Sequence, residues 1–188
     1  MRLILASESP RRQQILKEAG FDYKVIPSKY NECLFSNQPI LTAKTFALNK
    51  AKDVFENLPF NQDCVVLGAD TVVYHNGQIL GKPKDKEHAC QMLLSLSGKV
   101  HTVITGFCVY SKEQIIVDHD ESLVCFNQLD SKVIDAYLES GLYIGKAGAY
   151  GIQDKQFNLV KNFTGSINNV IGLPIEKIKP ILLKALKI

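Results

Sequence analysis

The sequence predicts an α/β protein with a mixed sheet. Apolar segments of strand length alternate with amphipathic segments of helical period, which is the pattern of strands joined by helices. A later pair of apolar segments is joined by Asn76-Gly77, the dipeptide that type I′ hairpin turns prefer, and a hairpin makes its strands antiparallel. One sheet is therefore expected to contain both parallel and antiparallel pairs.

The first third of the chain predicts two strands and two helices. A buried strand over residues 2–6 leads to Ser9, the expected N-cap, and to Pro10 in the first helical position, where its missing N–H is harmless. Gly20 ends this helix. The next two elements are a strand over residues 21–28 and an amphipathic helix over residues 42–58.

The rest of the chain adds mostly antiparallel strands and short helices. The expected elements are a hairpin over 64–83, a helix from Asp85 through Leu96, strands over 100–110 and 114–126, a helix over 131–141, a strand near 158–161 and a helix from Pro174. Residues 164–174 are expected to form a turn, and Pro180 to kink or divide the last helix. Because no repeat or linker divides the chain, residues 1–188 are expected to form a single domain.

Composition narrows the classes of function. The chain has 188 residues, 46% of them hydrophobic, which is enough to bury a core. Its net charge of +3 is too small to imply nucleic-acid binding, although clustered cations can still hold a small polyanion. Five scattered cysteines disfavour a zinc site or disulfide framework, and no segment has the length of a signal peptide or membrane span. We therefore expect a cytoplasmic protein without membrane or nucleic-acid partners, and a homodimer is one option for its oligomeric state.

The first candidate site is the segment SESPRR, residues 7–12, where the first helix begins. The helix dipole, the free backbone N–H groups and the hydroxyls of Ser7 and Ser9 favour an anion there, and Arg11 and Arg12 add two permanent charges. A guanidinium can bind two phosphate oxygens at once. The segment predicts a phosphate site, and the alternative is a capped surface helix with solvated arginines.

Asp70 is the second candidate, because it interrupts the apolar strand segment VVLGADTVV. An ionised carboxylate in such a strand is costly unless it is paired or binds a metal. Asp70 is predicted to bind Mg²⁺ or to deprotonate a water, and the alternative is a carboxylate satisfied by the backbone or by a lysine. Glu32 is a candidate second carboxylate, with a surface residue as its alternative. The hairpin is expected to return Lys82 toward Asp70, where its charge would neutralise a leaving phosphate.

The glycine-rich segment over residues 145–153 is the third candidate. Gly141 and Gly145 are too close together for a P-loop, Ala147 stands where a hydroxyl is needed, and the glycine spacing does not match a dinucleotide fingerprint. Glycine backbone can still approach a base or a sugar closely. Gln153 has an amide donor and an amide acceptor with which to read a base edge.

Taken in order, these segments resemble the Maf family of nucleoside triphosphate pyrophosphatases. The similarity runs through ASESPRR, Glu32, ALNKA, GADTVV, LGKP, SGKVHTVITG, SLVCF, KAGAYGIQ and GSINNVIGLP, and covers nearly the whole chain. It implies a Maf and inosine-triphosphatase-like fold with two lobes around a central cleft. It also implies hydrolysis of a nucleoside triphosphate to the monophosphate and pyrophosphate, dependent on Mg²⁺ or Mn²⁺, in a house-cleaning role.

The resemblance also implies roles for individual residues. Asp70 is the implied catalytic base, and Arg11, Thr71 and Gln153 are the implied determinants of base preference. The segment AYGIQ resembles the branch that acts on dTTP and UTP, with modified pyrimidine nucleotides left open as substrates. We expect Asp70 and Glu32 to hold the metal, and the sequence does not separate the base and ligand roles of Asp70. The groups expected to cradle the triphosphate are Ser7, Arg11, Arg12, Lys50 and Lys82.

Two positions depart from the family pattern, and one other function competes with hydrolysis. Asn31 replaces the usual acidic residue before Glu32, which leaves a metal role in that loop to Glu32 alone. Asp154 replaces the usual glycine after Gln153 and is expected to place a negative charge or a stiffer backbone beside it. The competing function is a nucleotide-binding regulator of septum formation that senses nucleotide without significant turnover.

Overall fold

The computed structural model describes residues 1–33, 36–58 and 63–188, which form an α/β fold on one mixed sheet. Within these residues the strands are β1 (Arg2–Leu5), β2 (Tyr23–Val25), β3 (Cys64–His75), β4 (Gln78–Leu80), β5 (Val100–Tyr110), β6 (Ile115–Phe126) and β7 (Val160–Thr164). The helices are α1 (Pro10–Glu18), α2 (Pro39–Glu56), α3 (Lys86–Leu96), α4 (Ser131–Glu139), α5 (Ile167–Ile171) and α6 (Ile175–Leu186), with 3-10 helices η1 (Ala147–Ala149) and η2 (Lys155–Phe157). The predicted fold class is confirmed. None of the described helices is long and apolar enough to cross a bilayer.

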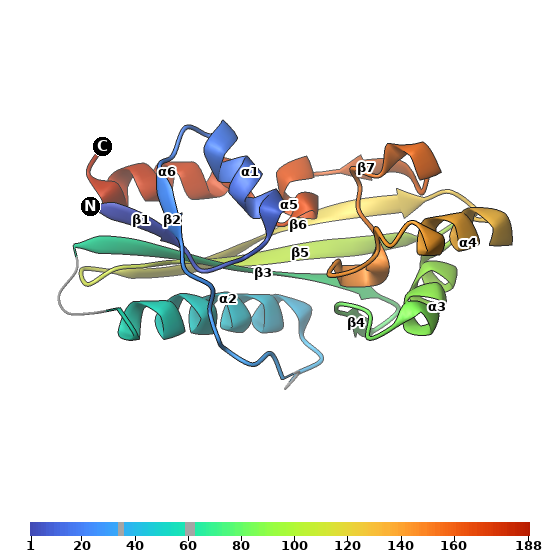
Figure 1. Ribbon diagram of the computed structural model, residues 1–188, viewed down its shortest axis with the longest axis horizontal. Helices are drawn as coiled ribbons and strands as arrows, with labels where there is room; N and C mark the ends of the chain where they lie inside the picture. Colours follow the sequence, from blue (N-terminus) through green and yellow to red (C-terminus); the bar gives the residue numbers. More distant parts are fainter. Residues whose placement is uncertain (34–35, 59–62) are drawn as a thin grey trace.

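The sheet combines a short parallel part with a longer antiparallel part. Its strand order is β2-β1-β3-β5-β6-β7, and β4 pairs with the end of β3. β1 is parallel to both β2 and β3, whereas β3, β5, β6 and β7 pair antiparallel. The crossovers from β1 to β2 and from β2 to β3 run in opposite directions along the sheet, so their helices cover opposite faces. Figure 1 shows this arrangement, with α1 and α6 above the sheet and α2 below it.

The chain reverses its winding direction between β1 and β3, which creates a crevice. In open α/β sheets, ligands bind beyond the carboxyl ends of strands at such a point. The pairing of β1 with β3 ends at Leu5 and Leu67, and the pairing of β3 with β4 begins at Val73. Asp70 and Thr71 therefore lie on β3 between its two partners along that edge, beside the loop that leaves β1.

Two hydrophobic regions lie at opposite ends of the long strands. At one end, α1 and α6 bury side chains such as Leu16 and Ile178 against one face, while α2 buries Ala47 and Val54 against the other. At the other end, α3 and α4 pack with η1 around a second core that contains Phe126. Figure 1 places α3 and α4 at the end of the sheet far from the two termini. The two ends form two lobes, as the family resemblance implies.

Most predicted elements are confirmed, with small shifts of their ends. Ser9 caps α1, and Asn76 and Gly77 both have positive φ, 48° and 77°, as a type I′ turn requires. α2 begins at Pro39 rather than at residue 42, because proline is favoured in the first turn of a helix. β2 is shorter than the predicted strand over 21–28. β7 begins later than predicted because Asn158, the C-cap of η2, has a left-handed backbone with φ of 48° rather than an extended one.

The structure corrects two details of the expectations for the C-terminal region. Residues 164–174 contain the short helix α5, whose first turn is capped by the hydroxyl of Ser166 accepting a hydrogen bond from Asn169 N. α6 continues through Pro180 as one helix, so this proline does not divide it. Pro180 is exposed, and water can bond to the carbonyl that loses its helical N–H partner.

Candidate active site

A cavity of about 510 Å³ opens beside the β3 edge and draws its lining from both lobes. Its walls come from the loop before α1, α1 itself, α2, β3 and the glycine-rich segment around η1. The residues proposed from the sequence all line this cavity: Ser7, Arg11, Arg12, Glu32, Lys50, Asp70, Thr71, Lys82 and Gln153. The fold therefore brings together segments that are far apart in the chain.

Asp70 lies on the α2 face of β3, where Lys50 of α2 reaches it. Lys50 Nζ lies 2.6 Å from Asp70 Oδ1 and 2.6 Å from Glu32 Oε1. Asp70 is only 5% exposed and Lys50 only 8%, so both charges are largely removed from water. Lys82 adds a second cation, with its Nζ 3.7 Å from Glu32 Oε1. Asp70 therefore has the lysine partner that the alternative from the sequence required. The same lysine, Lys50, also connects Asp70 to Glu32, a second carboxylate in the cavity.

Gly68 explains why Lys50 comes so near the strand. A Cβ at residue 68 would lie 2.2 Å from the backbone oxygen of Ala47 and 2.9 Å from the Cβ of Ala51. Only glycine at this position lets the middle of α2 lie directly against β3. The same turn of α2 then carries Lys50 over Asp70, two residues beyond Gly68 on the same face of the strand.

The two carboxyl groups have opposite pKa shifts. Burial raises the pKa of Asp70, and the nearby Glu32 charge raises it further against the attraction of Lys50. Partial burial also favours the neutral form of Glu32, but Lys50 and Lys82 together hold the pKa of Glu32 below its usual value. Asp70 is therefore the more basic carboxylate, which suits a proton acceptor.

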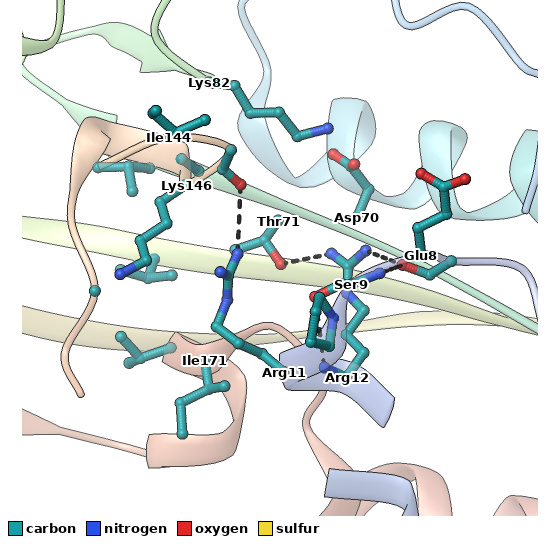
Figure 2. A pocket seen from close by; sticks show the side chains of 18 of the residues that line it. Glu8, Ser9, Arg11, Arg12, Asp70, Thr71, Lys82, Ile144, Lys146 and Ile171 are labelled. Carbon is teal, nitrogen blue, oxygen red and sulfur yellow. Dashed lines mark hydrogen bonds between the residues drawn. The ribbon is translucent and has the colours of Figure 1, made fainter. Parts of the chain in front are cut away.

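Thr71 points to the opposite face of β3 from Asp70, toward α1. Arg12 donates from Nη2 to Thr71 Oγ1 at 3.1 Å (Figure 2). It also donates from Nη1 to Ser7 Oγ at 3.1 Å and from Nε to Gly172 O at 2.7 Å. Three contacts on three segments fix the guanidinium in one orientation. Arg12 is thus a fixed positive charge in the cavity wall rather than a mobile side chain.

A hydrogen-bond chain behind Thr71 was not predicted from the sequence. Thr71 Oγ1 lies 2.9 Å from Thr105 Oγ1, and Thr105 donates to Asn169 O at 2.8 Å. Asn169 is fully buried and donates through its amide to Val103 O and Ser122 Oγ. This chain connects Arg12 to α5. No local pattern in the sequence singles out Thr105 or Asn169, because the contacts join residues that are far apart in the chain.

The loop that carries Glu32 also has an unpredicted support. Asp53 of α2 accepts hydrogen bonds through Oδ2 from Ser28 Oγ at 2.7 Å and from Lys29 N at 2.8 Å. Ser28 Oγ in turn accepts from Tyr30 N at 3.0 Å. These bonds hold the start of the loop against the same helix that provides Lys50, and so bring Glu32 to the cavity.

The other end of the cavity is formed by apolar side chains and the glycine-rich segment. Its apolar residues are Val73, Val103, Ile144, Ala147, Tyr150, Val170 and Ile171, with Gln153 nearby in the lining. Arg11 spans this end, where its Nη2 donates to Gly145 O at 3.3 Å (Figure 2). Gly148 has φ of 67°, and a Cβ on it would lie 2.9 Å from Val73 Cγ2. The segment therefore lies against β3 as closely as glycine allows.

Asp154 lies beside Gln153 as part of an ion pair. The Asp154 carboxylate is bound by the Lys146 ammonium and accepts a hydrogen bond from the Tyr137 hydroxyl at 2.6 Å. Lys146 neutralises its charge, so of the two expected effects of Asp154 the stiffer backbone stays a prediction. Lys146 carried no signal of this role, because only the fold brings it to Asp154.

Comparisons with known families and proteins agree with this arrangement. The family model described as Maf-like protein matches residues 2–185, nearly the whole chain. The chain belongs to the Maf-like protein family. The family resemblance seen in the sequence is therefore confirmed.

Relatives of this Maf-like protein bear the name dTTP/UTP pyrophosphatase. The protein of Aquifex aeolicus (strain VF5) is 45% identical, over 97% of this chain and 94% of its own length. The protein of Alkaliphilus oremlandii (strain OhILAs) is 45% identical over 96% and 94%, respectively. The protein of Thermosipho africanus (strain TCF52B) is 42% identical over 97% and 92%. Each alignment spans the segments that form the cavity.

The donor set at the charged end suits a hard divalent cation. Glu32 and Asp70 both direct a carboxylate oxygen to Lys50 Nζ, so the two carboxylates already converge on a positive charge. Among the residues that the structure describes, no group of three or more histidine, cysteine, aspartate or glutamate side chains gathers around one point. Mg²⁺ commonly binds through one or two carboxylates, with substrate phosphates and waters as its other ligands. The residues present fit that mode of binding.

Proposed function

We propose that this Maf-like protein hydrolyses nucleoside triphosphates, with dTTP and UTP preferred, to the nucleoside monophosphate and pyrophosphate. The observation that carries the proposal is the division of the cavity, with Asp70 and the Lys82 ammonium on one side and the apolar Ile144 and Ile171 on the other (Figure 2). A nucleotide has the same division, between a polyanionic tail and a planar base. The names of the relatives support pyrimidine triphosphates as the substrates.

The phosphates would bind at the charged end. Arg12, Lys50 and Lys82 supply positive charge, and the start of α1 adds backbone N–H groups and the positive end of the helix dipole. Arg12 is already oriented by Gly172, Ser7 and Thr71, so it would bind without losing further side-chain freedom. Such preoriented charges stabilise the charge that develops as pyrophosphate leaves.

Asp70 would accept the proton of the attacking water. The water oxygen forms a bond to the α-phosphorus, the bond from that phosphorus to the bridging oxygen breaks, and the bridging oxygen leaves with pyrophosphate. Burial raises the pKa of Asp70, which makes its carboxylate a better proton acceptor than an exposed one. Lys50 holds Asp70 and Glu32 in position, and Lys82 lies where it would neutralise the leaving group.

Glu32 and Asp70 would also hold Mg²⁺ or Mn²⁺. A bound divalent cation supplies positive charge to phosphate oxygens and lowers the pKa of a coordinated water. Glu32 suits a ligand role because its pKa is held below the usual value and it stays ionised. In this proposal Glu32 is a ligand only, whereas Asp70 is both a ligand and the proton acceptor.

The base would occupy the apolar end. The side chains of Val73, Val103 and Ile171 offer apolar contact to a planar ring, and Gln153 offers a donor and an acceptor to its edge. Arg11 lies at this end through its bond to Gly145, and Thr71 lies nearer the phosphates through its bond to Arg12. This placement supports the base-preference roles that the family resemblance implies for these three polar residues.

The test is to incubate the protein with UTP or dTTP and Mg²⁺ and to identify the products by ion-exchange chromatography. We expect UMP or dTMP together with pyrophosphate. Nucleoside diphosphate with orthophosphate would reject the proposed bond. Tight nucleotide binding without turnover would instead favour a regulator that senses nucleotide.

A further inference from the structure

A buried polar cluster lies directly beneath the turn that carries Gln153. The Asp154 carboxylate binds the Lys146 ammonium and accepts a hydrogen bond from Tyr137 Oη at 2.6 Å. The side chains of Lys146 and Asp154 are each only 11% exposed, and Tyr137 is fully buried. A lysine and an aspartate with so little exposure form a pair that water screens weakly.

The same cluster holds the backbone of the turn. Tyr137 Oη accepts a hydrogen bond from Gly151 N at 3.1 Å while it donates to Asp154, so it joins both ends of the turn. Asp154 N donates to Gly151 O at 3.1 Å, which closes the turn around Ile152 and Gln153. Burial and the Asp154 carboxylate raise the pKa of Tyr137, so its hydroxyl keeps the proton that it donates. The backbone on both sides of Gln153 is therefore held by the cluster, while the Gln153 side chain itself is exposed.

Gly151 shows how tightly the cluster fits the turn. A Cβ at residue 151 would lie 2.6 Å from Lys146 Nζ and 2.7 Å from Asp154 Oδ2. The two charged atoms thus lie against the glycine backbone itself. A side chain at residue 151 would therefore displace one of the two charged groups.

Lys146 lines the cavity, yet its charge serves the turn rather than the phosphates. Figure 2 shows its side chain running away from Asp70 and from Lys82, which mark the charged end. Its neighbour Gly145 accepts the hydrogen bond from Arg11. One side chain thus connects the segment that Arg11 contacts to the turn that presents Gln153.

We propose that Lys146, Asp154 and Tyr137 form a positioning cluster that fixes Gln153 and thereby sets which pyrimidine the cavity accepts. The inference rests on the proposed function and concerns the base end of the same site. A glutamine amide can match uracil, or cytosine after a half-turn of the amide, because donor and acceptor exchange places. To discriminate between these bases, the site must present the amide in one position and one orientation, and the turn sets the backbone from which the side chain extends. The cluster supplies that constraint without touching the substrate.

The decisive variant removes both charges together, Lys146→Met with Asp154→Asn. Removal of one partner would leave a buried unpaired charge, whereas removal of both keeps the stability close to that of the wild type. We expect the ratio of kcat/KM for UTP to that for CTP to fall about tenfold, equivalent to about 1.4 kcal/mol of discrimination. The lower ratio should result from a higher KM for UTP, with kcat for UTP near its wild-type value. An unchanged ratio in the folded double variant would overturn the proposal, as would an equal loss for both nucleotides.

Two further measurements separate this proposal from the proposed function. Calorimetric binding of the non-hydrolysable α,β-methylene analogues of UTP and CTP needs no turnover, so it reports base discrimination even if the wild type hydrolyses nothing. The control is Lys155→Met, which removes an exposed lysine next to Asp154 and should leave the ratio unchanged. If the double variant does not fold, Tyr137→Phe replaces it and should shift the ratio in the same direction. A folded Tyr137→Phe protein with wild-type discrimination would then contradict the proposal.

Discussion

The two ends of the cavity are built on different physical principles. At the charged end, ions neutralise one another, since the buried Lys50 pairs with the buried Asp70 and with the more exposed Glu32, and Arg12 is held by three neutral oxygens. At the apolar end, close packing against glycine and a fixed turn define the shape. The first end depends on which charges are present, and the second depends on where backbone atoms lie.

This difference predicts which substitutions damage which property. Loss of a charge at the first end should reduce turnover for every nucleotide, since all triphosphates share the same tail. A change of shape at the second end should alter KM and base preference and leave the chemistry intact. Variants at the two ends can therefore be distinguished by whether kcat or KM changes.

The largest effect is expected for Asp70→Asn at the charged end. The amide cannot accept a proton from water, and proton transfer typically contributes about 10²–10⁴-fold to a rate. We expect kcat for UTP and dTTP to fall by an amount in this range while the far-UV circular dichroism is unchanged. An undiminished kcat would remove Asp70 from the chemistry.

The next largest effect is expected for Arg12, the second of the two arginines in α1. Lysine cannot reproduce the contacts of Arg12 with Gly172, Ser7 and Thr71, and bonds from a charged donor contribute about 1.5–3 kcal/mol each. Arg12→Lys should lower kcat/KM about 10- to 100-fold for all triphosphates alike.

Arg11→Ala should instead have a smaller effect that differs between bases, because Arg11 contacts the glycine-rich segment. Steady-state kinetics with UTP, dTTP, CTP and GTP measure both effects. Equal losses for Arg11→Ala across all four nucleotides would place Arg11 with the phosphates.

A third variant tests packing at the apolar end. In Gly148→Ala the new Cβ would lie 2.9 Å from Val73 Cγ2, at a buried and conformationally stiff side chain. Overpacking of this kind costs about 1–3 kcal/mol, and the displaced wall should raise KM for UTP with little change in kcat.

Gly141→Ala is the matched control, because Gly141 has nearly the same positive φ, 70°, and only Ile144 Cδ1, at 3.9 Å, near a new Cβ. Gly141→Ala should lose only the stability that alanine loses at a positive φ, without a clash, so its KM for UTP should match that of the wild type. A rise of KM in both variants would show that packing on Val73 is not the cause.

The smallest effect is an acid-dependent loss of stability near the apolar end. His101 is 2% exposed, and its Nε2 lies 2.7 Å from the hydroxyl of Tyr150, which lines the cavity. Burial, and secondarily the charge of His75, lower the pKa of His101 from 6.5 to about 3. Between pH 6.5 and about pH 3, His101 is therefore protonated in the unfolded chain but neutral in the folded protein. The free energy of unfolding should fall by about 1.4 kcal/mol per pH unit as the pH drops below 6.5.

Urea unfolding at pH 7.0, 6.0 and 5.0 measures this slope. His101→Phe, in an aromatic cluster with Phe126 and Tyr150, should flatten the slope over the same range. A wild-type stability that does not change from pH 6.5 to pH 5 would show that His101 protonates freely in the folded state.

Local signals predicted most of the fold. Ser9 with Pro10, and Asn76 with Gly77, specify their structures through their own backbone preferences, and both predictions are confirmed. The short helix α5 was missed because five residues give too little helical period to distinguish it from a turn. The order of strands, and hence the crevice between β1 and β3, depends on crossovers that no local pattern encodes.

The residues of the candidate site also fall into those with a local signal in the sequence and those without one. Asp70 was proposed because a carboxylate in an apolar strand is locally anomalous, and Arg12 because positive charges are disfavoured at a helix start. Lys146, Thr105 and Asn169 show no local anomaly. Their roles arise only from contacts across 8 to 64 residues of sequence, as in Lys146 with Asp154 and Thr105 with Asn169.

Neighbouring residues of β3 face opposite sides of the sheet, Asp70 toward α2 and Thr71 toward α1. Which face of the sheet each residue of β3 points to is therefore as important as the composition of the strand. One residue inserted between Cys64 and Asp70 would exchange the two faces, turning a carboxylate toward Arg12 and a hydroxyl toward Lys50. Length variation in this enzyme should accumulate in its loops, whereas β3 should accept substitutions and reject insertions and deletions.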